Sequence, residues 1–484
     1  MTRVEPPPEP LATGHSAGRA EGVASGRSFA PTAGASALTR AQLNERALYR
    51  RAVEAVIWGM PAVNYDLMLQ GLTPWGGGPN QVAYWSRQLD WRNQTLTPNP
   101  NTVYLHPFYD TKAAGPMVLE IPPAEDGCSI TGNVDDCWQS ALEDVGPAGA
   151  DKGQGGKYLI LPPDYEGQPP AGYIVLPSDT YQGYAILRSD VKSGSEADVA
   201  AAVAYGKRVR FYPHAQADDP PETRFVDLAG KLYDATIPYD RRFFRSLARM
   251  VDYEPWLTRD KAMIGPLQTL GIVKGEPFAP DPSTEAAFDA AALEAQALVD
   301  LRREELFDPP YFAGTHWAVP AAHEVIEGNT NFYADPNAYP VGDRAVIYSM
   351  GYFSAKHLGA GQFYLMALHD REGQSLDGAA TYRLHVPAKA PVKLYWSATA
   401  YDRQTHALLR DVTRASRASN SPDIQANPDG SVDLWFGPEA PPGHETNWTP
   451  TRADRGFEVL FRLYGPEKAL FDKAWVLPDL ERAG

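Results

Sequence analysis

The stretch WRNQTLTPNPNTVYLHPFYDTKAAGPMVLEIP, residues 91–122, joins two patterns that together indicate the fold. Its first part is crowded with Asn and Pro, residue types that mark tight turns. Its last part, residues 116–122, is a short apolar run bounded by proline, which is typical of a strand. We therefore expect strands here, with a turn rich in amide side chains directly before one of them.

Similar runs recur on both sides of a helical block. Short apolar runs bounded by Pro and Gly indicate an antiparallel β-sandwich or barrel, and they lie at residues 116–122, 157–163, 172–177 and 183–188. The last third returns to alternating apolar and polar residues, which again predict strands, at 361–370, 380–387, 391–402, 430–437 and 456–466. The sequence thus predicts a mainly β fold with two β-domains.

Helical periodicity predicts the parts between and before the strands. Thr39 and Gln42 form a capping-box pattern, followed by a helix that we expect to end at Gly59 and Pro61. Ser195 is a candidate cap for another helix. Apolar residues with a period near 3.6 predict a helical insertion or connector, at 239–256, 258–272 and 283–307. We expect a disordered tail over 1–38, an N-terminal β-domain over 39–190 with its leading helix, the helical connector over 191–330, and a C-terminal β-domain over 331–484.

Composition excludes some partners. The 44 Lys and Arg against 60 Asp and Glu give a net charge of −16, which disfavours nucleic acid. We find no run long and apolar enough to span a membrane. The N-terminus has no apolar signal region as written, so a cytoplasmic location is expected; the protein would be periplasmic or secreted if that start were mis-assigned or replaced. Cys128 and Cys137 are interpreted as reduced and structural, with a disulfide between them as the alternative.

Several long blocks resemble one protein family, in order along the chain. They include YWSRQLDWRNQTLTPNPNTVYL (84–105), DKGQGGKYLILPP (151–163) and NPDGSVDLWFGPEAP (427–441). The N-terminal β-domain resembles domain of unknown function 1254 and the C-terminal one resembles domain of unknown function 1214, a pair found in bacterial proteins. The resemblance implies two jelly-roll-like β-sandwiches, a layout shared with some glycan-cleaving amidases. It does not supply a substrate.

The amide-rich turn is one candidate site. Asn99 and Asn101 would either hold the turn through local hydrogen bonds or orient a ligand at the mouth of a pocket. Nearby aromatic side chains, including Tyr65, Trp85 and Tyr104, suit a sugar or another flat ligand but are equally common in β-domain cores. The family usually has Asp where this chain has Asn101, and an amide cannot act as a general base at neutral pH.

The segment GNVDDCWQ, residues 132–139, holds the catalytic candidates Asp135 and Asp136. Adjacent residues of a strand point to opposite faces, so one of the two carboxyl groups can face a cavity beside Trp138 and Gln139. Its pKa would then be raised, as a general acid or base needs. The alternative is that the Asp caps a helix starting near Trp138.

No metal site and no cofactor are expected. His316, His323, Glu324 and Glu327 do not have the spacing of a zinc protease, and phosphate-loop and nucleophile-elbow motifs are missing. The leading hypothesis is therefore a cofactor-independent hydrolase of a polar, glycan-like or amide-bearing substrate. The alternative is a protein that binds a carbohydrate or small molecule without breaking a bond, and self-association into a homo-oligomer stays open.

Overall fold

The computed structural model describes residues 38–125, 127–352, 354–357 and 361–483. Its contacts divide the chain into two units, residues 1–46 and residues 47–484. The tail expected over residues 1–38 lies outside the described residues apart from Leu38. In the first unit the capping box is confirmed: the Thr39 N–H donates to Gln42 Oε1 at 3.0 Å, and the Gln42 N–H donates to Thr39 Oγ1 at 3.3 Å. Helix α1 (Arg40–Leu72) begins there.

The expectation that this helix ends at Gly59 and Pro61 is wrong, because α1 continues to Leu72. Most residues from Ala52 to Leu72 are buried, so packing compensates for the backbone hydrogen bond that Pro61 cannot donate. Gly59 has a packing role instead. A Cβ at this position would lie 2.7 Å from a methyl carbon of Leu247, so the glycine lets two helices approach closely.

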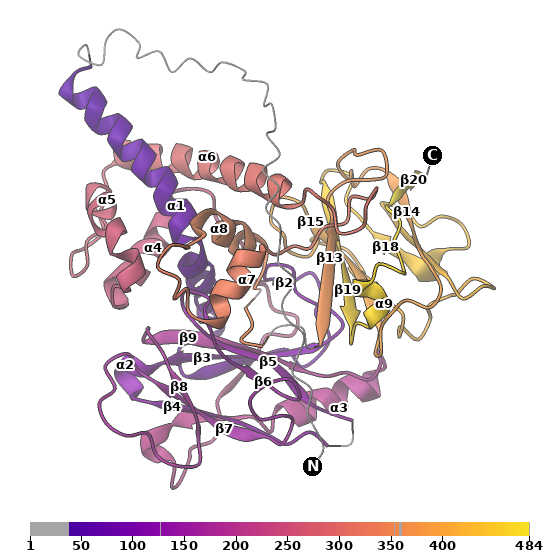
Figure 1. Ribbon diagram of the computed structural model, residues 1–484, viewed down its shortest axis with the longest axis horizontal. Coiled ribbons are helices and arrows are strands. Elements are labelled where there is room, and N and C mark those ends of the chain that lie inside the picture. The colour runs from indigo at the N-terminus through magenta and orange to yellow at the C-terminus, as the bar shows by residue number, and fades with distance from the viewer. Residues whose placement is uncertain (1–37, 126, 353, 358–360, 484) are drawn as a thin grey trace, which may run out of the picture. The chain divides into compact units, whose positions relative to one another are not determined.

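The N-terminal sandwich consists of two sheets (Figure 1). The first has the strand order β11-β1-β3-β9-β5-β6, with bounds Phe225–Asp227, Gln81–Tyr84, Val103–Asp110, Gln182–Ser189, Ile130–Asp136 and Ala141–Val145. The second has the order β10-β4-β7-β8, with bounds Arg210–Pro213, Met117–Ile121, Gly156–Leu161 and Ile174–Pro177. Most neighbouring strands are antiparallel. The exceptions are β11, which pairs in parallel with β1, and β8, which pairs in parallel with β7. The apolar runs read from the sequence, such as Leu119 and Ile160, meet Leu105 and Leu187 in the core between the sheets.

The C-terminal sandwich also has two sheets. One has the order β13-β19-β15-β16, with bounds Gln362–Ala367, Phe457–Tyr464, Trp396–Asp402 and Ser416–Ala418. The other has the order β18-β17-β14-β20, with bounds Trp448–Pro450, Val432–Gly437, Thr381–Val386 and Glu481–Ala483. Leu365 and Phe461 of the first sheet and Leu384 and Phe436 of the second share one core. A short helix, α9 (Lys468–Phe471), follows β19.

The helical connector is only partly as expected. Its helices are α4 (Arg241–Tyr253), α5 (Ile264–Thr269) and α6 (Pro282–Leu306), followed by α7 (His323–Thr330) and α8 (Val341–Met350). The predicted cap Ser195 is confirmed at α3 (Glu196–Gly206), where its hydroxyl accepts the Asp198 N–H. However, residues 191–330 also contain β10 and β11, which complete the N-terminal sheets, and β12 (Tyr233–Asp234), which pairs with β2 (Asn93–Gln94).

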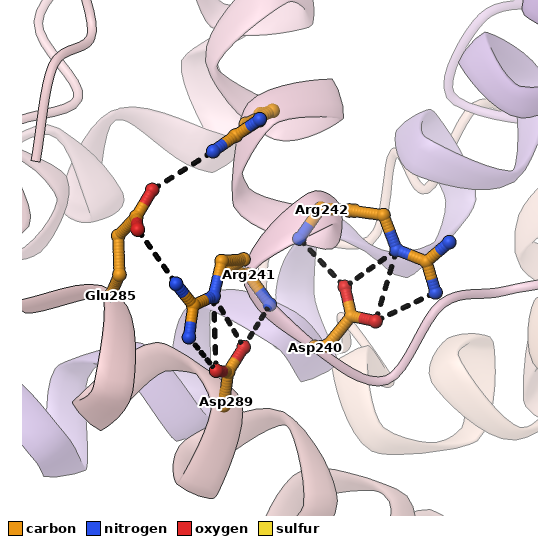
Figure 2. Close-up of polar contacts among 6 residues, drawn as sticks. Asp240, Arg241, Arg242, Glu285 and Asp289 are labelled. Carbon is orange, nitrogen blue, oxygen red and sulfur yellow. Dashed lines mark hydrogen bonds and ion pairs between the residues drawn. The ribbon is translucent and has the colours of Figure 1, made fainter. Parts of the chain in front are cut away.

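Charged side chains tie two of these helices together. Arg241 at the start of α4 pairs with Glu285 at 2.7 Å and with Asp289, both on α6 (Figure 2). Arg245 reaches the other Glu285 oxygen at 2.9 Å, and Asp240 caps α4 by accepting the Arg242 N–H at 2.8 Å. These carboxylates thus hold α4 against α6 and satisfy the start of the helix.

A third core forms where the two sandwiches meet. The outer face of the six-stranded sheet, with Phe108 and Tyr184, packs against α1 and α8 and against Met366 and Leu460 of the C-terminal sandwich. The chain is therefore sheet-rich with several antiparallel sheets, and helices fill the space beside them (Figure 1). No helix within the described residues is long and apolar enough to cross a membrane. Cys128 and Cys137 are both free thiols.

Candidate functional site

Asp135 and Asp136 stand at the end of β5 and have different surroundings. Asp135 is fully buried, and both of its carboxyl oxygens accept from Asn133 Nδ2, at 2.7 and 2.8 Å. Burial, and then the charges of Asp136 and Asp144, raise the pKa of Asp135 well above its usual range. Its neighbour across the strand pair is Tyr184 of β9, so Asp135 lies on the outer face of the six-stranded sheet.

Asp136 holds a turn. Its Oδ1 accepts the N–H groups of Trp138 and Ser140 at 2.9 and 2.8 Å. The segment between β5 and β6 is a tight turn in which Gln139 has a φ of 65°, so the helix expected near Trp138 is a wrong prediction. The turn forms in place of a helix because one aspartate oxygen satisfies two of the turn's backbone N–H donors. Burial raises the pKa of Asp136, and the charges of Arg259 and Arg344 oppose that rise.

The amide-rich turn fastens the two sandwiches to each other. Asn99 is buried, accepts the Asn101 N–H at 3.0 Å and donates to the Tyr464 hydroxyl of β19. Asn101 Nδ2 donates to Ser416 Oγ of β16 at 3.0 Å. The turn residues thus bond to the C-terminal sandwich, whereas Asp135 bonds to Asn133 and lies near Ser354, so the two halves of the expected catalytic site have no shared partner.

A cavity lies beside this turn, between the sheets of the two sandwiches. Its water-accessible volume is about 40 Å³. The N-terminal wall comes from β3 and β9, the C-terminal wall from β13 and β19, and the segment before the amide-rich turn covers it. The lining residues are Asn93, Thr95, Leu96, Thr97, Pro98, Tyr104, His106, Ile186, Arg188, Tyr352, Tyr364, Leu460 and Arg462. We call this space the arginine cavity.

Two guanidinium groups belong to this lining, one from each sandwich. Arg462 is buried and bonds only neutral oxygens, with Nη1 on Thr399 Oγ1 at 3.1 Å and Nη2 on Tyr401 Oη at 2.7 Å and the Thr97 carbonyl at 2.8 Å. Arg188 lies 5.4 Å from the Tyr104 ring centroid, and its Nε meets no hydrogen-bond partner among the described residues. No carboxylate lines the cavity within the described part of the chain. Asp190, which feels the Arg188 charge, lies outside the lining and bonds Ser129.

His106 and Tyr352 add two neutral polar groups to the cavity. Burial, and then the Arg188 charge, lower the pKa of His106 to about 3, so the ring is neutral at ordinary pH with one donor and one acceptor nitrogen. Neither ring nitrogen has a hydrogen-bond partner in the residues that the structure describes, and the Tyr352 hydroxyl meets the Leu96 backbone N–H, which leaves its own proton to donate. Buried polar atoms are normally bonded, so a group of this kind suggests a partner from outside the chain.

The sequence-predicted binding residues divide between this cavity and the core. Tyr104 lines the cavity, its hydroxyl accepts the Asn99 N–H at 3.1 Å, and the Trp85 ring lies 5.3 Å from that of His106. The others lie farther along the sheet face or in the helical core. Tyr65 stacks near Tyr184, Trp138 packs 4.7 Å from Trp58, and Gln139 accepts the Tyr184 hydroxyl.

Sequence reasoning missed His106, Arg188, Tyr352, Tyr364 and Arg462. A signal was present for the arginines. Arg188 in GYAILR and Arg462 in GFEVLFRLYGP are cations within apolar strands, where a charge is unexpected unless a site needs it. Among the described residues, no group of His, Cys, Asp and Glu is arranged to hold a metal ion.

Comparisons with known proteins agree on the family and on the fold. The family model "Protein of unknown function (DUF1254)" matches residues 79–213, and "Protein of unknown function (DUF1214)" matches residues 361–468. The search of curated proteins found no match.

Two solved structures resemble the chain. The crystal structure of the VPA0106 protein from Vibrio parahaemolyticus has a TM-score of 0.56 at 16% identity, covering 90% of this chain and 100% of that one. A putative uncharacterized protein from Burkholderia cenocepacia matches at a TM-score of 0.40 and 10% identity, with 91% and 96% covered. The first of these likenesses supports the fold alone. From the two family matches, the chain belongs to the proteins that pair a DUF1254 region with a DUF1214 region.

Proposed function

We propose that this protein binds a small anionic ligand in the arginine cavity. One observation carries the proposal: Arg188 and Arg462 bring two positive charges to a cavity whose described lining contains no carboxylate. A buried charge is costly unless an opposite charge or several hydrogen bonds compensate it. An anion between the two guanidinium groups would supply both.

The geometry around the arginines favours a ligand rather than a purely structural role. Arg462 is held by three neutral oxygens, which fix its position without neutralising it. The planar guanidinium donates in a fork that matches the oxygens of a carboxylate or phosphate group. The arginines come from β9 and β19, one on each sandwich, so a bound anion would also link the two sandwiches.

The test compares the melting temperature in increasing acetate or phosphate, at constant ionic strength set with chloride. A ligand that binds only the folded state stabilises it by RT ln(1 + [L]/Kd), so the melting temperature should rise with anion concentration. Arg188→Met removes one cation and keeps a linear side chain over Tyr104, so its response should be lost. Arg371→Met is the control, because Arg371 is exposed and pairs with Glu481. Equal responses in wild type, R188M and R371M would contradict the proposal.

A second candidate is the hydrolase expected from the sequence, with Asp135 as its acid. The observation in its favour is that burial raises the pKa of Asp135, a side chain on the same sheet face as Arg188, in the direction that a general acid needs. A protonated carboxyl group donates a proton to a leaving group at neutral pH. The substrate would be a polar, glycan-like or amide-bearing compound.

We also propose that both sandwiches are jelly rolls. In each, strands distant in sequence are neighbours in the sheet, as in β3-β9-β5 and β13-β19-β15. Such crossovers between two packed sheets are the connections from which jelly rolls are built.

A further inference from the structure

We propose that the ligand of the arginine cavity is a short 2-hydroxy monocarboxylate of about two or three carbons, whose hydroxyl group lies between His106 and Tyr352. This inference rests on the proposed anion binding and specifies its ligand. It is argued from the part of the cavity lining that lies beside the two arginines, which includes His106 and Tyr352.

The size of the cavity limits the ligand. A water-accessible volume of about 40 Å³ holds about three or four water-sized positions, at about 10–15 Å³ each. Covalently bonded atoms lie closer together than waters do, so about five or six heavy atoms fill such a space. Glycolate and lactate have that size.

The walls favour a carboxylate over an inorganic oxyanion. Leu96, Pro98, Ile186 and Leu460 form an apolar part of the lining. Sulfate and phosphate carry oxygens on every side, and those that faced these side chains would lose their hydration without gaining a donor. A carboxylate places its oxygens at one end, toward the guanidinium groups, and leaves a hydrocarbon part for the apolar wall.

The neutral polar groups of His106 and Tyr352 favour a ligand that carries a hydroxyl group. A neutral imidazole offers one acceptor and one donor nitrogen, and Tyr352 offers a donor hydroxyl. Both ring nitrogens are buried and have no partner among the residues described, and the Tyr352 hydroxyl, which meets the Leu96 backbone N–H, still has its own proton to donate. A ligand hydroxyl can donate to the imidazole and at the same time accept from the Tyr352 O–H. A plain alkyl carboxylate would leave the imidazole and the Tyr352 proton unbonded, which costs binding free energy.

His106 is positioned to make this choice of ligand. Its ring is enclosed edge-on by Trp85 at 5.3 Å and Tyr104 at 5.4 Å. It lies on β3, antiparallel to β1, where it pairs with Ala83. These contacts fix the ring, so the hydroxyl preference is built into the sheet. Phe is apolar, has a similar ring and suits these aromatic neighbours, so His106→Phe should fold.

The experiment is a calorimetric titration of the full chain with matched acids. L-lactate and D-lactate are compared with propionate, glycolate with acetate, and phosphate is included as the inorganic anion. We expect one lactate enantiomer to bind at least about tenfold more tightly than propionate, because a site built for a hydroxyl rejects the analogue that lacks it. In His106→Phe and Tyr352→Phe the difference should shrink while propionate still binds. His385→Phe, at a half-buried histidine of the other sandwich that pairs with Asp433, should behave as wild type.

The outcomes separate this inference from the proposed function. Equal affinities of lactate and propionate in wild type would overturn the hydroxyl site and leave anion binding standing. Binding of phosphate with no binding of any carboxylate would do the same. If no anion binds, or if Arg188→Met binds all of them as wild type does, both proposals fail.

Discussion

At the scale of single residues, Asp135 separates the two candidate functions. Its carboxyl group is buried beside Asn133 and away from the lining of the arginine cavity. If the protein is a hydrolase that uses Asp135 as a general acid, Asp135→Asn should lower turnover by about 10²-fold or more, the usual contribution of such a group. The variant keeps the size of the side chain, so its melting temperature should stay within a few degrees of wild type.

The measurement is the hydrolysis of nitrophenyl glycosides, esters and anilides by wild type, D135N and a D179N control. Asp179 lies in the exposed loop before β9, and its substitution should leave turnover unchanged. Turnover retained in D135N would exclude Asp135 as the acid. The binding function does not depend on this residue, so D135N should still bind anions.

The amide-rich turn could be predicted from the sequence only in part. Asn and Pro correctly indicate the turn, and Tyr104 after it lines the arginine cavity. The sequence left open whether the Asn99 side chain faces a ligand or the protein, and it bonds Tyr464, more than three hundred residues away. A contact between residues so distant along the chain has no local periodicity and cannot be read from the pattern around either one.

At the scale of elements, Glu254 connects α4 to the turn before β9. It caps the C-terminal end of α4, and its two carboxyl oxygens accept the N–H groups of Tyr181 and Gln182 at 2.7 and 3.0 Å. Burial raises the pKa of Glu254 to about 8, although these two hydrogen bonds oppose the rise.

This raised pKa gives a direction for stability against pH. The folded chain keeps the Glu254 proton to higher pH than the unfolded chain, so the group favours folding fully below its ordinary pKa. That contribution is lost as the pH rises through about 8. From pH 5 to 8.5 we expect wild type to lose about 4 kcal/mol of unfolding free energy relative to Glu254→Gln, at about 1.4 kcal/mol per pH unit between the two pKa values. Urea unfolding of both proteins across this range measures it. An unfolding free energy of wild type minus that of Glu254→Gln that stays constant or rises with pH would contradict it.

Element types were easier to predict than element ends. The strands at 116–122 and 456–466 and the helix at 283–307 are present because their period is set by which face is buried. The predicted end of α1 was wrong because packing against distant helices buries the residues after Pro61, and this burial outweighs the helix-breaking effect of the proline. The short strands β10 and β11 were assigned to the connector because three or four residues carry too little periodicity to predict a strand.

At the scale of the whole molecule, the second unit places its candidate site where two sandwiches meet. The sequence predicted two β-domains but not that the outer face of one sheet would be buried against the other domain. That burial explains why His106, Arg188 and Arg462, on strands with two covered faces, share one cavity. Because each sandwich supplies one arginine, we expect the anion to couple their stabilities.

Anomalous scattering from crystals grown in bromide would locate anions bound to this protein directly. Bromide is a small monovalent anion that reports positive sites without depending on which ligand is natural. We predict an anomalous peak between the guanidinium groups of Arg188 and Arg462 in wild type, and its loss in Arg188→Met. Bromide found only on the surface, with the arginine cavity holding water in both proteins, would contradict the claim that this cavity binds an anion.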